Sequence, residues 1–98
     1  MYYCIYGEDS ENSAEKRRSV RPAHLKRLEE LKAQGRLLTA GGLLNEDLDE
    51  HASHGFNGSV IIAAFDNLAE AEAWAATDPY ATAEVYARIF VKPFKWVF

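Results

Sequence analysis

The sequence contains a single cysteine, Cys4, so no disulfide can form within the chain. A lone cysteine is consistent with a reducing compartment, and we expect a cytoplasmic protein. No apolar run approaches the roughly 18 residues that a membrane-spanning helix needs. The first ten residues also lack the basic flank and apolar core of a signal peptide. We therefore predict no contact with a membrane.

Sequence motifs for the common cofactors are absent too. There is no P-loop, dinucleotide-binding fingerprint, haem-attachment motif or zinc-type spacing of Cys and His. His51 and His54 form an H-x-x-H motif beside several acidic residues, but an irregular loop does not hold metal ligands in a defined geometry. We interpret this segment as a solvated loop and predict neither a metal nor a cofactor.

Positive charge is scarce except near the N-terminus. The net charge is −4, yet residues 1–36 hold eight Lys and Arg against six Asp and Glu, whereas residues 37–98 hold three against nine. Nucleic-acid binding depends on neutralising phosphates, so this balance predicts no nucleic-acid partner. The basic cluster at residues 16–21 is the only local exception: it is a solvated surface, a site for a small anion or, as a third alternative, a contact for nucleic acid.

Length and composition predict one globular domain over residues 1–98. Of these residues 48% are hydrophobic and 27% charged, which is ordinary for globular proteins. Apolar alternation, helical spacing and turn signals predict strands at 2–6, 37–40, 59–65 and 85–91, helices at 22–34 and 67–77, short turns at 14–18 and 81–84, and an extended tail at 93–98. This order predicts an α+β, ferredoxin-like βαββαβ fold with an extra C-terminal strand.

The third predicted strand is apolar on both faces. Val60 and Ile62 alternate with Ile61 and Ala63, and both helices are needed to cover one face of the sheet. A second copy of the sheet is an economical cover for the other face, so we expect a face-to-face homodimer, a dimeric α+β barrel. Aromatic residues of the tail could extend that interface.

His24 is the first candidate for chemistry. It falls between Leu28 and Leu31 on the inward face of the helix and close to its N-terminus. Apolar surroundings and a helix N-terminus both disfavour imidazolium, which leaves a neutral ring able to act as a base near pH 7. The alternative is a histidine at the edge of the core, bonded to a backbone carbonyl.

Asp78 is the second candidate. It precedes Pro79 and Tyr80, so its side chain could simply cap the short turn that follows. It could equally accept a hydrogen bond from His24 and orient the imidazole, as the carboxylate of a catalytic triad does. Sequence spacing does not show a contact across 54 residues, so both interpretations stay open.

Several separate motifs occur in one order along the chain: YYCIY at 2–6, SVRPAHL at 19–25, GRLLTAG at 35–41, GFNGS at 55–59, AWA at 73–75, DPY at 78–80 and VKPFK at 91–95. In these motifs the chain resembles the YCII family of small bacterial proteins, in its YciI-like branch. The resemblance implies a dimeric α+β barrel with a His–Asp pair in a pocket, matching His24 and Asp78. The architecture is also similar to that of small lactone isomerases, and one family member dehydrochlorinates a chlorinated hydroxyquinol. Gly42 stands where relatives often carry proline, which affects the expected shape of the loop there.

Other residues are candidates for lining such a pocket. Arg17 and Arg21 precede His24 by about two turns and one turn, and either could bind a carboxylate or phenolate; we favour Arg21. The remaining candidates for substrate contact are the possible aromatic walls Tyr6 and Tyr80, Gly41 near the end of the second strand, and Ser59 at the head of the third. Cys4 we interpret as an inert buried thiol.

Together these features predict a small cofactor-independent enzyme. His24, oriented by Asp78, would perform general acid/base chemistry, an isomerisation or an elimination such as dehydrochlorination, on a small anionic or phenolic ring. The alternative is a non-catalytic homodimer that binds a metabolite or regulates a partner through the same pocket, because fold alone does not establish function.

Overall fold

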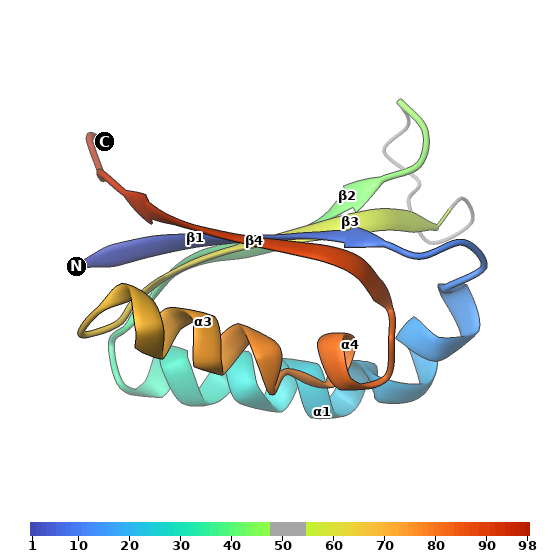
Figure 1. The fold of residues 1–98 in the computed structure, drawn as a ribbon, viewed down its shortest axis with the longest axis horizontal. Coiled ribbons are helices and arrows are strands. Elements are labelled where there is room, and N and C mark those ends of the chain that lie inside the picture. The colour runs from blue at the N-terminus through green and yellow to red at the C-terminus, as the bar shows by residue number, and fades with distance from the viewer. Residues whose placement is uncertain (48–54) are drawn as a thin grey trace.

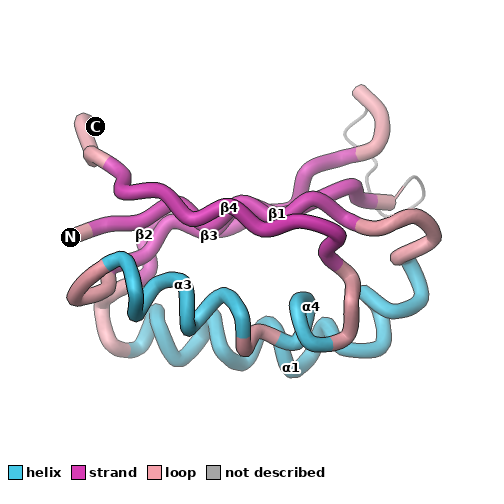
Figure 2. Tube along the Cα trace, in the orientation of Figure 1, coloured by secondary structure: helices cyan, strands magenta, loops and turns pink. Residues whose placement is uncertain are grey.

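The computed structural model describes residues 1–47 and 55–98. Its elements are β1 (Tyr2–Asp9), α1 (Ala14–Ala33), β2 (Leu37–Leu44), β3 (Phe56–Ala64), α3 (Leu68–Ala76), α4 (Pro79–Thr82) and β4 (Tyr86–Phe94). The strands form one antiparallel sheet in the order β2-β3-β1-β4, and the helices lie together below it (Figures 1 and 2). The expected α+β class and element order are confirmed. None of the described helices is long and apolar enough to cross a membrane.

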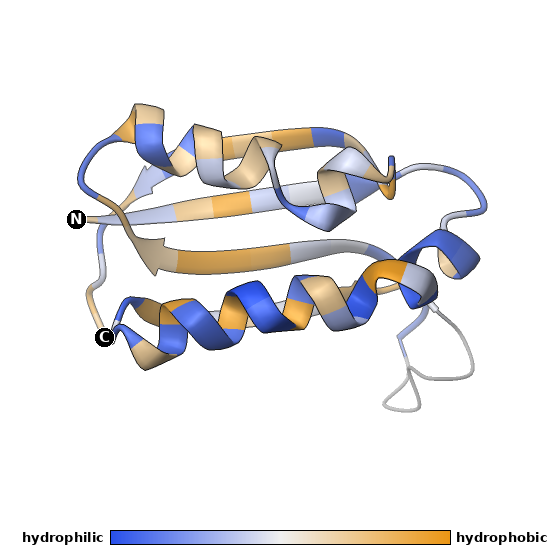
Figure 3. Ribbon diagram, turned by 90° about the horizontal axis from the view of Figure 1, so that it is seen from below, coloured by the Kyte–Doolittle hydropathy of each residue, from blue (hydrophilic) through white to orange (hydrophobic). Residues whose placement is uncertain are grey.

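The core lies between the sheet and the helices. Strand side chains alternate between faces, and every second residue of β1 and β3 points toward the helices. The buried apolar residues there are Tyr3, Ile5, Ile61, Ala63 and Phe65 from the sheet side, with Leu31, Ala71 and Ala75 from α1 and α3. The view from the helix side shows hydrophilic residues along the outer surface of α1 and apolar residues on the strands behind it (Figure 3).

Helix α1 is longer than the sequence predicted. Instead of a short turn followed by a new helix at Pro22, one helix runs from Ala14 to Ala33 with Pro22 inside it. Pro22 lacks the N–H that would bond to the carbonyl of Arg18. Both residues are exposed, so water can satisfy that carbonyl. The continuous helix places Arg17, Arg21 and His24 on successive turns of one element.

The predicted fifth strand is not a separate element of the described structure. Strand β4 continues through Pro93 to Phe94, and residues 95–98 follow it outside the sheet. A proline is tolerated in β4 because this strand forms an edge of the sheet. Trp96 in the tail forms a T-shaped pair with Tyr2, with 5.6 Å between the ring centroids.

Strand β2 also differs from the prediction. Gly41 and Gly42 do not end it, because β2 continues to Leu44 and Gly42 pairs with Ser59. A Cβ atom at Gly42 would lie only 2.5 Å from the ring of Phe56. Glycine therefore lets the Phe56 ring lie directly against this strand.

No helix of the described residues covers the sheet face away from α1 and α3 (Figure 1). Cys4 and Tyr6 lie on this face, since Tyr3 and Ile5 point to the core. Ile62 pairs with Cys4 and is partly exposed. Cys4 itself is half-buried rather than fully buried, and burial raises the pKa of its thiol. The two apolar faces inferred from the sequence are thus present.

Candidate active site

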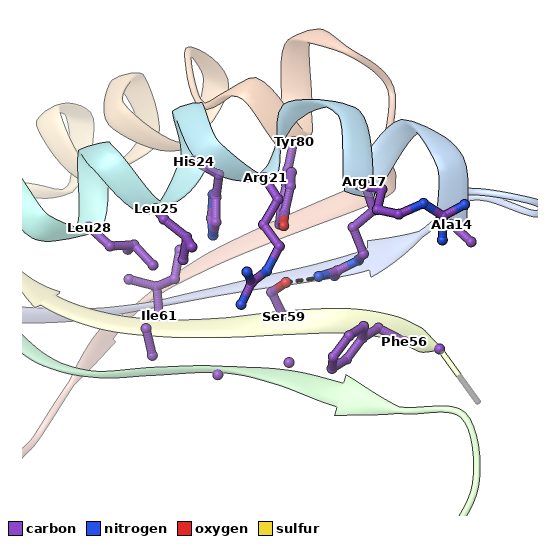
Figure 4. A pocket seen from close by; sticks show the side chains of 15 residues that line it. Ala14, Arg17, Arg21, His24, Leu25, Leu28, Phe56, Ser59, Ile61 and Tyr80 are labelled. Carbon is purple, nitrogen blue, oxygen red and sulfur yellow. Dashed lines mark hydrogen bonds between the residues drawn. The ribbon is translucent and has the colours of Figure 1, made fainter. Parts of the chain in front are cut away.

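A cavity of about 350 Å³ lies between α1 and the neighbouring strands β2 and β3. Side chains of α1 point down into it and the two strands form its floor (Figure 4). Tyr80, from α4, completes one wall. Of the site residues expected from the sequence, His24, Arg17, Arg21, Gly41, Ser59 and Tyr80 line this cavity.

His24 and Asp78 are hydrogen-bonded to each other. Nδ1 of His24 lies 2.8 Å from Oδ2 of Asp78, and both residues are buried, with 5% and 2% of their surface exposed. The same Oδ2 accepts a bond from the backbone N–H of Tyr80 at 2.9 Å, so Asp78 also caps α4. The two interpretations of Asp78 are therefore compatible in one geometry.

The contact with Asp78 determines which nitrogen of His24 is available. A carboxylate only accepts, so Nδ1 of His24 must donate, and the neutral ring then has its lone pair on Nε2. Among the described residues Nε2 has no hydrogen-bond partner, and the ring points into the cavity (Figure 4). Tyr80 stacks on the imidazole with 3.8 Å between centroids and 11° between planes, which restricts rotation of the ring.

Arg27 also belongs to the site, although it was not among the residues expected from the sequence. Its Nη1 donates to Oδ1 of Asp78 at 3.2 Å and to the carbonyl of Trp74 at 3.0 Å, and its guanidinium lies over the Trp74 ring. Arg27 follows His24 by three residues, so the two lie on one side of α1. That spacing was visible in the sequence, but the position of Asp78 beside them was not.

Arg17 is held by the protein itself. It makes a two-point contact with Asp9 at 2.9 and 3.1 Å, and it donates to the carbonyl of Gly58 and to Oγ of Ser59. Burial alone would lower the pKa of Arg17, but the hydrogen bond and charge of Asp9 outweigh burial and raise it. Arg17 thus anchors α1 to the sheet as a permanently charged group.

Arg21 is different. It is exposed, lines the cavity one turn before His24, and has no ion pair or hydrogen bond within the described part of the chain. Its guanidinium reaches down toward the strands (Figure 4). Of the two arginines considered from the sequence, Arg21 is the one whose donors are available to a ligand.

The YCII-related domain matches residues 1–95. The chain belongs to the YCII family. Protein YciI of Escherichia coli is 53% identical to it over the full length of both chains, and a protein of Haemophilus influenzae is 52% identical over the same span.

A solved structure extends the comparison to a ligand complex. The 5-chloro-2-hydroxyhydroquinone dehydrochlorinase of Burkholderia phenoliruptrix, in complex with 2,5-dihydroxybenzoquinone, superposes with a TM-score of 0.86 and 27% sequence identity. The match covers 97% of this chain and 94% of that one. A protein of the same fold is therefore an enzyme that acts on a small ring.

Within this YCII chain, Ser59 is part of the floor rather than a free nucleophile. Its hydroxyl accepts from Arg17 at 2.8 Å, so it is already engaged by the protein. Tyr86 fits beneath β1 because Gly7 has no side chain, as a Cβ there would lie 2.5 Å from the ring. Burial raises the pKa of Tyr86, and it also raises the pKa of Tyr80.

One residue expected to line the site does not do so, and one expected motif lies outside the described residues. Tyr6 does not line the cavity, because it points to the opposite sheet face, where its ring contacts Phe90. His51 and His54 fall outside the described residues. Within residues 1–47 and 55–98, no group of three or more His, Cys, Asp or Glu side chains is arranged to hold a metal ion.

Proposed function

We propose that this YCII protein is a small cofactor-independent enzyme in which His24 acts as general acid and base on a small anionic or phenolic ring. The observation that carries the proposal is the 2.8 Å contact from Nδ1 of His24 to buried Asp78, in the wall of a cavity into which the ring points. A histidine held in one tautomer presents its other nitrogen to a ligand, and this is the arrangement that a general base needs.

The reaction class follows from a single positioned base. Nε2 accepts a proton from a ring carbon next to a carbonyl, and the electron pair left behind forms a new double bond. In an elimination, a halogen on the neighbouring carbon leaves as halide with its own bonding pair. In an isomerisation, the same nitrogen returns the proton to another carbon. Neither route changes an oxidation state, so neither needs a redox cofactor, and proton transfer of this kind supplies about 10²–10⁴-fold acceleration.

The other lining residues would bind the ring. Arg21 would hold a carboxylate or phenolate oxygen with its free guanidinium donors. Tyr80 would limit the thickness of the space beside the imidazole because it is stacked on His24. The related dehydrochlorinase acts on a chlorinated hydroxyquinol, which supports a substrate of this size.

Turnover is tested with 5-chloro-2-hydroxyhydroquinone and a panel of lactones, by following halide release and product formation. His24→Ala and Asp78→Asn should both lower kcat strongly while circular dichroism shows an intact fold. Normal turnover by His24→Ala would refute the mechanism. Thermal stabilisation by these compounds without any turnover would instead favour a non-catalytic metabolite-binding protein.

We also propose that the uncovered sheet face binds a second copy of the chain. The face carries apolar and aromatic side chains, and Phe90 and Trp96 are 41% and 50% exposed. A two-fold pairing would bury identical patches against each other and leave both cavities open on the outer, helical sides. Light scattering coupled to gel filtration should give the mass of a dimer, and Phe90→Glu should shift it toward the monomer. A monomeric mass for the unmodified protein at micromolar concentration would contradict the pairing.

A further inference from the structure

The cavity has two chemically different ends. Near His24 it is lined by Leu25, Leu28, Ile61 and Tyr80, an apolar and aromatic set. Toward the start of α1 it is lined by three arginines, Arg17, Arg18 and Arg21. At 1.5 Å of rise per residue, Arg21 and Arg18 lie about 4.5 and 9 Å along the helix from His24. Figure 4 shows this succession, with Arg21 between His24 and Arg17.

The positive charge at the arginine end is not balanced by the protein. No Asp or Glu lines the cavity, within the part of the chain that the structure describes. Arg17 is neutralised by Asp9, but Arg21 and Arg18 have no ion pair there. Arg18 also borders a shallow surface depression with Glu15, so Arg21 is the cation committed to the cavity. Unpaired guanidinium groups beside a low-dielectric wall favour binding of an anion.

Aromatic side chains line the space at both ends, with Tyr80 near His24 and Phe56 near the arginines. The ring of Phe56 lies against the floor because Gly42 leaves room for it, and it forms a wall at the arginine end. A volume of about 350 Å³ is near the lower limit for drug-sized ligand sites, so it holds a ring together with a substituent. A reacting carbon must approach Nε2 within about 3 Å. An anionic group that contacts Arg21 then belongs to a different part of the molecule.

We infer that the ligand of this cavity is a ring acid, a planar unsaturated or aromatic ring with a carboxylate separate from its reacting position. The ring lies beside His24 and Tyr80, and the carboxylate pairs with Arg21, with Arg18 as a second cation. This inference rests on the proposed function only in placing the reacting carbon at His24. The acid-binding end can be tested without any turnover.

The test compares two probes that differ in one group. Isothermal titration calorimetry at low salt measures binding of 2,5-dihydroxybenzoate and of hydroquinone, which lacks the carboxylate. The acid should bind at least about tenfold more tightly, because its carboxylate forms a charge-assisted hydrogen bond that hydroquinone cannot form, although this bond is partly screened at an exposed arginine. Arg21→Met should remove this advantage, so that the acid and hydroquinone bind with similar affinities. The advantage should also shrink at high salt.

The matched control is Lys26→Met, which removes one positive charge from an exposed position of α1 that does not line the cavity. It should leave the preference for the acid intact. Equal affinities for the two probes, loss of the preference in Lys26→Met as well, or no saturable binding of the acid would each overturn the inference. His24→Ala separates the two proposals: it should abolish turnover and keep the preference for the acid.

Discussion

Arg27 donates to one oxygen of the Asp78 carboxylate while the other oxygen accepts from His24. Asp78 thus joins two residues of α1 to the N-terminus of α4, and its carboxylate cannot rotate without breaking both contacts. Oδ2 of Asp78 additionally accepts from the backbone of Tyr80, whose ring stacks on His24. The position of the imidazole therefore depends on Asp78 and Arg27, which do not line the cavity, as well as on Tyr80, which does.

The tautomer of His24 is the first prediction. Because Asp78 accepts from Nδ1, neutral His24 should be protonated on Nδ1 and bare on Nε2. Nitrogen-15 NMR of the side chain distinguishes the two nitrogens directly. In Asp78→Asn this preference should weaken or reverse, since an amide can donate as well as accept. Protonation of Nε2 in the unmodified protein would show that the ring is turned or differently bonded.

Arg27 should stabilise the fold through Asp78. Arg27→Gln leaves a carboxylate that is 2% exposed with less charge compensation, so the free energy of unfolding should fall by about 1–3 kcal/mol. Lys26→Gln removes the same charge at an exposed neighbouring position and should change it by less than about 0.5 kcal/mol. Urea denaturation measures both. If Arg27 stabilises the fold through its contact with Asp78, Arg27→Gln should lower the free energy of unfolding by less in an Asp78→Asn background.

Gly7 should be intolerant of even one methyl group. A Cβ at this position would lie 2.5 Å from the Tyr86 ring, which would have to move. Gly7→Ala should therefore cost about 1–3 kcal/mol in the free energy of unfolding, the usual cost of overpacking. The same change in a Tyr86→Ala background should cost clearly less. Equal costs in both backgrounds would show that the destabilisation by Gly7→Ala does not come from a clash with Tyr86.

Alkaline pH should destabilise the protein through Tyr86. Burial raises the pKa of Tyr86 above its ordinary value near 10, so above pH 10 the unfolded chain loses this proton before the folded one does. The free energy of unfolding is then constant with respect to this group below pH 10 and falls as the pH rises further. Tyr80 contributes in the same direction.

Urea denaturation between pH 8 and 11.5 tests this dependence. Tyr86→Phe keeps the buried ring and removes only the hydroxyl, so its free energy of unfolding at pH 8 should differ from that of the unmodified protein by less than about 1.5 kcal/mol. Its stability should then decline less steeply above pH 10, because it has one fewer buried phenol to ionise. Parallel declines would mean that Tyr86 does not titrate differently in the folded protein.

Contacts between residues that are close along the chain could be predicted from the sequence. Asn67 accepts from the N–H of Glu70 at 2.9 Å, as the spacing of a capping box predicts, and Asp78 with Pro79 begins α4 as expected. Apolar alternation located the strands, and the βαββαβ order followed from them. The length of α1 was underestimated because a proline on a solvated helix face costs less than one in the core.

The sequence by itself determined the order of the four strands and two main helices and the sheet's two apolar faces, but not every bound of these elements. Which face the helices cover was decided only by tertiary structure: Tyr6 and Tyr3 are both aromatic, so alternation separates them without saying which is inside. The same holds for the site. The sequence placed Arg17, Arg21 and His24 on one stretch of chain, but the fold brought Asp9 to Arg17 and Asp78 to His24 and Arg27. Contacts across such distances depend on strand register and helix packing, which no local pattern encodes.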